Sequence, residues 1–83
     1  MKILWDERKR LINSDRPGLD FADLDEGFFT RAFIGPARQG RRRAVGRLSD
    51  GTIVVIFATL GTEAFNVTSM RPANREERKL VDG

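Results

Sequence analysis

A cluster of arginines in the middle of the chain is the feature best suited to chemistry. Between Arg31 and Arg47 the chain carries six arginines and no acidic residue. Arginine presents a planar fork of N–H donors that matches the oxygens of a phosphate or a carboxylate two at a time. Such a stretch suits a polyanion such as RNA, or an acidic protein partner. The alternative is a solvated basic face.

The composition narrows the chemistry further. The 83 residues include no histidine and no cysteine, so proton transfer would depend on Asp, Glu, Lys or Arg. No disulfide is available, and a transition-metal site would need carboxylates alone. The net charge of +3 combines an acidic excess in residues 1–29 with a basic excess in residues 30–83. No apolar run approaches a membrane span and no signal peptide is evident, so we expect a soluble, cytoplasmic protein.

The elements that must position these residues begin with a short strand and a helix. Residues 2–5 form an apolar run typical of a strand or an extended segment. Asp6 can cap a helix over residues 7–13, which carries Leu11 and Ile12 on its apolar side.

A second helix is expected after a turn at Arg16-Pro17-Gly18. Asp20 is a suitable N-cap, and the helix is predicted to run to about Phe29. Its apolar positions fall on one helical face, at Phe21, Leu24 and Phe28.

The apolar pattern then changes from helical spacing to alternation. Asp50-Gly51 lies between two extended runs, which predicts a β-hairpin. Residues 53–57 are apolar at every position and are predicted to be the central strand. Asn74 and Glu77 have the spacing of a capping box, which opens a last helix ending near Val81. The other predicted strands cover residues 31–34, 41–48 and 64–69.

The fold class is therefore α+β, in a single domain over residues 1–83. We expect a small antiparallel sheet of about four strands, with two N-terminal helices and one C-terminal helix. The six phenylalanines are expected mainly in the core, although Phe28, Phe29 and Phe33 could instead stack on nucleic-acid bases. The predicted core contains Leu4, Phe21, Leu24, Phe28, Val45, Val54, Ile56, Phe65 and Val67.

Three stretches of the chain carry an ordered pattern. The opening has Trp5, Asp6, Lys9, Asn13, Gly18 and Phe21. The middle has Arg41, Val45-Gly46, Asp50-Gly51 and the apolar run 53–57. The end, residues 69–78, reads S-M-R-P-A-N-R-E-E-R. This set resembles the BrnT family, toxins of bacterial type II toxin–antitoxin systems, whose sequences open with W-D-x-x-K-x-x-x-N…G-x-x-F and end with I-S-A-R-x-A-x-x-x-E-R.

The resemblance implies a RelE-like fold and a metal-independent ribonuclease that arrests translation and needs no cofactor. It also implies a partner, an antitoxin of the ribbon-helix-helix type, which would cover the active surface.

Such cleavage needs a base for the 2′-hydroxyl, cations for the phosphorane and an acid for the leaving oxygen. Arg71 would stabilise the transition-state charge, Glu77 could act as the base, and Lys9 could donate to the leaving group. The alternatives are a capping role for Glu77, a salt bridge to Glu77 or Glu76 for Arg71, and a solvated side chain for Lys9. The expected RNA-binding set is Arg38, Arg41, Arg42, Arg43, Arg47 and Arg75.

The chain departs from the family pattern at four polar positions. Pro17 stands where a histidine is common, Asn66 where an arginine is frequent, and Phe57 where a tyrosine is often found. Gly40 stands where an acidic residue often precedes the middle arginine. These departures leave a second hypothesis open, in which the chain is a non-catalytic module that binds RNA or an antitoxin on the same fold.

Overall fold

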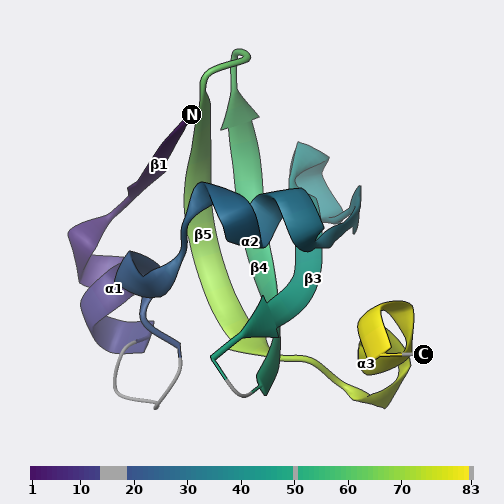
Figure 1. Ribbon diagram of the computed structural model, residues 1–83. Coiled ribbons are helices and arrows are strands. Elements are labelled where there is room, and N and C mark those ends of the chain that lie inside the picture. Colours follow the sequence, from purple (N-terminus) through teal and green to yellow (C-terminus); the bar gives the residue numbers. More distant parts are fainter. Residues whose placement is uncertain (14–18, 50, 83) are drawn as a thin grey trace.

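The computed structural model describes residues 1–13, 19–49 and 51–82 (Figure 1). The regular elements follow one another as strand, helix, helix, four strands and a last helix. Their bounds are β1 Lys2–Trp5, α1 Glu7–Asn13, α2 Glu26–Arg31, β2 Phe33–Pro36, β3 Arg42–Leu48, β4 Gly51–Leu60, β5 Ala64–Pro72 and α3 Arg75–Asp82. Two short 3₁₀ helices, Phe21–Asp23 and Arg38–Gly40, precede α2 and β3. None of the helices in the described ranges is both long enough and apolar enough to cross a bilayer.

The five strands form one mixed sheet in the order β1-β5-β4-β3-β2. The expectation of about four antiparallel strands is corrected here, because β1 pairs with β5 in parallel, Ile3 opposite Phe65 and Trp5 opposite Val67. The other three pairings are antiparallel. A parallel pairing between the two ends of a chain leaves no turn signal in the sequence, whereas each hairpin does.

β4 is the central strand, as predicted, and it is buried on both faces. Val55 and Phe57 belong to the main core beneath α2, which crosses one face of the sheet in Figure 1. Val54 lies on the other face and packs with Val45 and Ala73 in a smaller cluster that includes Val81 of α3. One face of the sheet therefore packs against α2, and the other face packs against α3.

The second helix differs from its prediction. Asp20 caps only the 3₁₀ helix, because its side chain accepts a hydrogen bond from the Ala22 N–H. Leu24 then adopts extended dihedral angles, and Asp25 caps α2 by accepting from the Phe28 N–H at 2.8 Å. Two capping aspartates five residues apart divide what the apolar spacing alone indicates as one helix.

α1 has the predicted bounds but buries no residue. Leu11 and Ile12, expected on an apolar side, are 56% and 76% exposed. The predicted turn at Arg16-Pro17-Gly18 lies outside the described residues.

The β3–β4 hairpin is confirmed, with a shifted turn. Leu48 pairs with Gly51, so Gly51 is already the first residue of β4. Ser49, with φ 57°, belongs to the turn instead. Asp50 lies outside the described residues.

A bulge in β5 decides which side chains share a face. Ile56 pairs with Ser69 while Phe57 pairs with Val67, which leaves Thr68 as an extra residue. Val67 and Met70 therefore both reach the main core. Arg71, opposite Val54, is directed to the other face, the one that carries α3.

Most of the predicted core is confirmed, with three exceptions. Leu4 is 42% exposed, because Ile3 and Trp5 on either side of it point into the core and alternation turns Leu4 away. Ile56 and Phe65 are half-buried.

Candidate nucleic-acid interface

Glu77 and Arg71 meet where β5 leads into α3. The carboxylate accepts from Nη1 of Arg71 at 2.7 Å on Oε1 and from Nη2 at 2.8 Å on Oε2. The predicted capping box is also present: the Asn74 N–H donates to Glu77 Oε1 at 2.9 Å, and the Glu77 N–H donates to Asn74 Oδ1 at 2.8 Å. The expected approach of these residues is thus found, and both alternative interactions, cap and salt bridge, occur together.

Arg43 of β3 completes this cluster from 34 positions away. Its Nη1 donates to Glu77 Oε2 at 3.4 Å, longer than the Arg71 contacts. The Nε of Arg43 is buried and has no hydrogen-bond partner. Arg43 and Arg71 stand on either side of β4 on the α3 face, because Ile56 pairs with Arg43 and Val54 with Arg71.

The electrostatics of Glu77 follow from these donors. Its side chain is only 6% exposed, and burial alone would raise its pKa. The hydrogen bonds from Arg71 outweigh burial, and with the Asn74 N–H and the nearby charges of Arg71 and Arg43 they lower the pKa of Glu77 to about 2. The same pair raises the pKa of Arg71. Glu77 is therefore a carboxylate at neutral pH, and its two oxygens accept four N–H donors.

A basic groove opens beside this cluster. Its volume is about 470 Å³, and four of its lining side chains are arginines. The 3₁₀ turn before β3 supplies two of them, because positive φ at Gln39 and Gly40 folds the chain so that the Arg41 N–H donates to the Arg38 carbonyl at 3.1 Å. The lining residues are Pro36, Ala37, Arg38, Arg41, Arg43, Ile56 and Arg71. This groove can bind an anion with several oxygens, such as a phosphodiester.

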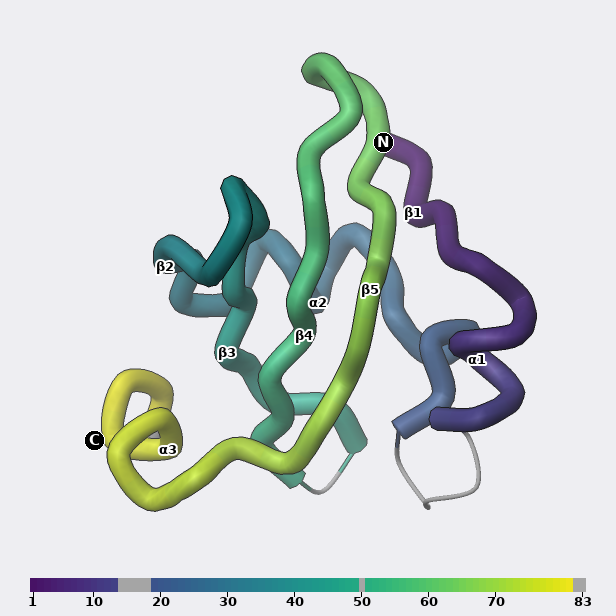
Figure 2. The backbone as a smooth tube through the Cα atoms, turned by 180° about the vertical axis from the view of Figure 1, so that it is seen from behind, coloured from purple at the N-terminus to yellow at the C-terminus, as the bar shows by residue number. Residues whose placement is uncertain are grey.

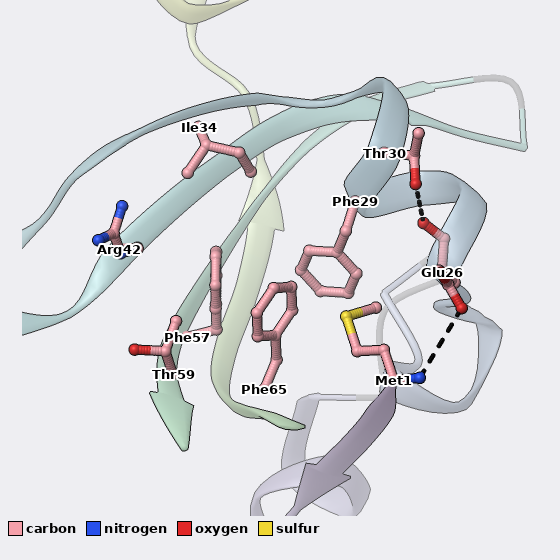
Figure 3. A pocket seen from close by; sticks show the side chains of 9 residues that line it. All are labelled: Met1, Glu26, Phe29, Thr30, Ile34, Arg42, Phe57, Thr59 and Phe65. Atoms are coloured by element: carbon pink, nitrogen blue, oxygen red, sulfur yellow. Dashed lines mark hydrogen bonds and ion pairs between the residues drawn. The ribbon is translucent and has the colours of Figure 1, made fainter. Parts of the chain in front are cut away.

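The predicted RNA-binding arginines do not share one surface. Although Arg41 and Arg42 both line a further hollow of about 380 Å³ at the β2 edge, strand alternation turns Arg42 away from Arg43, to the α2 side of the sheet. There it lines an apolar pocket of about 260 Å³, in which Phe29, Phe57 and Phe65 pack with their ring centroids 4.7–5.2 Å apart (Figure 3). The other lining residues of this pocket are Met1, Glu26, Thr30, Ile34 and Thr59.

Arg47 and Arg75 also lie outside the groove. Arg47 lines a separate hollow of about 530 Å³ near the β3–β4 hairpin, together with Arg78. Arg75 is the exposed first residue of α3. Of the six predicted arginines, the structure therefore brings Arg38, Arg41 and Arg43 together.

Lys9 is not brought to the groove. It is exposed on α1, which contacts β5 and the first 3₁₀ helix, whereas α3 contacts β3. Figures 1 and 2 show α1 and α3 on opposite sides of the molecule.

The four departures from the family pattern fall in different places. Phe57 is buried in the main core, and Gly40 sits in the turn with φ 73°. Asn66 is half-buried in β5 opposite Ala58, on the face that carries the groove. Pro17 lies outside the described residues.

Sequence reasoning missed the link between Arg43 and Glu77. Arg43 was one of several consecutive arginines, and no local spacing distinguishes it from Arg42. Only the pairing of β3 with β4, combined with the bulge in β5, determines which arginine faces Glu77.

One solved structure of a known protein is similar to this chain over most of its length. Scanning protein-family models and searching curated proteins gave no match. The 1.1 Å crystal structure of the Brucella abortus ribonuclease toxin BrnT matches with a TM-score of 0.81 and 46% sequence identity. The match covers 90% of this chain and 99% of the solved chain. With this identity over nearly all of the solved chain, the present chain belongs to the BrnT family, as the sequence resemblance indicated.

Proposed function

We propose that this chain is the toxin of a bacterial type II toxin–antitoxin system and a metal-independent ribonuclease that inhibits translation. In this proposal residues 1–83 form one toxin domain that works in the cytoplasm. The observation that carries the proposal is the groove lined by Arg38, Arg41, Arg43 and Arg71, next to the buried Glu77. The likeness to a ribonuclease toxin supports it.

The proposed reaction is attack of a ribose 2′-hydroxyl on the adjacent phosphorus, which forms a 2′,3′-cyclic phosphate and breaks the bond to the 5′-oxygen. Water takes the proton of the 2′-hydroxyl, and the leaving 5′-oxygen gains a proton from water. The phosphorane between these steps carries extra negative charge, and cations already in place lower its energy. Arg71 and Arg43 are proposed to supply them.

Glu77 fits a positioning role better than the role of general base predicted from the sequence. A base with a pKa of about 2 is a weak proton acceptor at neutral pH. To accept a proton it would also have to give up one of its four N–H donors. We therefore propose that Glu77 fixes the guanidinium of Arg71. We propose no catalytic role for Lys9, which is exposed on α1.

The proposed partner is an antitoxin of the ribbon-helix-helix type that covers the groove. Acidic side chains on that antitoxin would complement the four arginines.

The alternative function is a non-catalytic module that binds RNA or the antitoxin in the same groove. The observation that favours it is the engagement of Glu77 with four donors, in a chain without histidine.

The first test is induced expression in a bacterial host. We expect growth arrest, with rescue by co-expression of the neighbouring small gene. Normal growth at good soluble yield would contradict the toxin proposal.

The second test separates cleavage from binding in vitro. RNA is incubated with purified protein in the presence of EDTA, and products are compared with a gel shift on the same RNA. Cleavage in EDTA is expected; a shift without products would favour the binding module.

Arg71→Ala is expected to reduce cleavage more than Arg42→Ala, because Arg42 faces the opposite side of the sheet. Thermal melts would check that both variants are folded. Equal losses of activity would refute the role of Arg71.

A further inference from the structure

One phenylalanine has an exposed ring on the face that carries the groove. Among the described residues, which include all six phenylalanines, Phe33 is the one whose side chain is exposed, at 46%. Phe21, Phe28, Phe29 and Phe57 are buried, and Phe65 is half-buried within the aromatic cluster of the opposite pocket. Phe33 belongs to neither of the two core clusters, so part of its ring is free to contact a ligand.

The strand register places Phe33 beside the arginines. Phe33 pairs with Val45, and Gly35 pairs with Arg43, so Phe33, Gly35 and Arg43 share the α3 face of the sheet. Pro36 and Ala37, which follow Gly35, line the groove. The ring of Phe33 and the groove are thus neighbouring parts of one surface.

The ring leans along β2 toward the groove. A Cβ built at Gly35 would lie 3.7 Å from Cε1 of Phe33, with no other atom within 4 Å. Gly35, which lies opposite Arg43, therefore places no side chain between Phe33 and the residues of β2 that line the groove. Phe33 is also absent from the cluster of Val45, Val54 and Ala73, whose half-buried partners are Ile56 and Val81.

We propose that Phe33 stacks on a base of single-stranded RNA next to the phosphate held by the arginine groove. This inference rests on the proposed RNA substrate. Proteins that bind single strands combine a basic groove for the backbone with aromatic side chains for the bases, and every base offers a face for stacking. RNA is favoured over an apolar protein segment because the strand that carries the ring continues into a groove lined by four arginines, which complement a phosphate chain.

The experiment measures binding without cleavage. Fluorescence anisotropy is recorded with a short single-stranded RNA whose 2′-hydroxyls are methylated, so that the cyclising attack is blocked. Phe33→Ala should weaken binding at least about fivefold, and Phe33→Trp should retain it.

Ile34→Ala is the matched control. Ile34 is the next residue of the same edge strand and is 38% exposed, but it pairs with Ala44 and faces the opposite pocket. Its removal should leave the affinity for RNA unchanged.

A second set of RNAs separates stacking from any indirect effect. On an RNA with abasic sites, wild type and Phe33→Ala should bind equally. The salt dependence of binding should be the same for both proteins, because the ring contacts no phosphate.

The inference is overturned if Phe33→Ala binds the methylated RNA as tightly as wild type, or if Ile34→Ala loses as much. It is also overturned if the Phe33 effect persists on abasic RNA, or if the wild type binds no RNA. Binding with the expected Phe33 effect, but no cleavage of unmodified RNA, would refute the ribonuclease proposal and leave the stacking inference standing.

Discussion

At the scale of single residues, Glu77 neutralises two cations that lie on different strands. Its replacement by glutamine keeps the shape and removes the charge, which leaves Arg71 and Arg43 near each other without a counterion. Both arginines are partly exposed, so the cost is below that of a fully buried pair. We expect Glu77→Gln to lower the free energy of unfolding by roughly 1–3 kcal/mol, measured by urea denaturation.

Glu76→Gln is the control for this prediction. Glu76 is the neighbouring residue on α3, is 81% exposed and meets Lys79 at 3.5 Å. Exposed pairs of this kind contribute about 0–1 kcal/mol, so the variant should be close to wild type. Equal effects of the two substitutions would mean that the Arg71–Glu77–Arg43 cluster does not stabilise the fold.

The lowered pKa of Glu77 predicts a pH dependence with a definite sign. The group binds its proton less readily in the folded state, pKa about 2, than at its ordinary value of 4.5. Its contribution to stability is therefore complete above about pH 4.5 and is lost as the pH falls toward 2. The difference in stability between wild type and Glu77→Gln should narrow over this range. A difference that stays constant from pH 6 to pH 2.5 would show that Glu77 is not held as a carboxylate.

At the scale of elements, α2 packs closely against β3 because Gly46 has no side chain. A Cβ at this position would lie 3.0 Å from Cε1 of Phe28 and 3.3 Å from Cβ of Ala32. Phe28 is buried in the main core, so an added methyl group at Gly46 would crowd its ring. Gly46→Ala is expected to destabilise the protein by about 1–3 kcal/mol, as overpacking of a core site does.

Gly51→Ala is the control: its Cβ would meet nothing within 4 Å, so it should change stability by less than about 0.5 kcal/mol. A thermal melt of each variant checks both values.

The elements that the sequence predicted well are those with local signals. The capping box at Asn74 and Glu77 fixed the start of α3 to within a residue, and the apolar run at 53–57 identified the central strand. Local signals failed where pairing is non-local. Nothing in residues 2–5 indicates a parallel partner near the other end of the chain.

The candidate site was predicted in part for the same reason. Arg71 and Glu77 approach each other across a short strand-to-helix corner, which sequence spacing can suggest. The contribution of Arg43 and the exclusion of Arg42 depend on which face each side chain takes. That choice follows from the register of β3 against β4, and the sequence carries no residue that fixes it.

At the scale of the whole molecule, the charges are separated along the chain. Residues 1–29 carry the acidic excess, and the basic excess of residues 30–83 includes Arg42, Arg43 and Arg47 of β3 and Arg71 of β5. Four arginines line the groove, and two of them, Arg43 and Arg71, contact one carboxylate, Glu77. The surface around the groove therefore has a net positive potential that a polyanion would follow toward the site.

This distribution predicts how RNA binding responds to salt. Each phosphate neutralised on a single strand contributes a slope of about −0.7 to log Kobs against log salt concentration. Three or four contacts in the groove give a slope of roughly −2 to −3.

Arg41→Ala should make this slope shallower by about 0.7, because it removes one phosphate contact. Arg42→Ala removes the same charge from a residue that does not line the groove and should leave the slope unchanged. If both variants changed the slope alike, RNA would be responding to the overall charge of the protein rather than to the groove. Anisotropy titrations at 50–300 mM salt, roughly the range over which such contacts are lost, make this comparison directly.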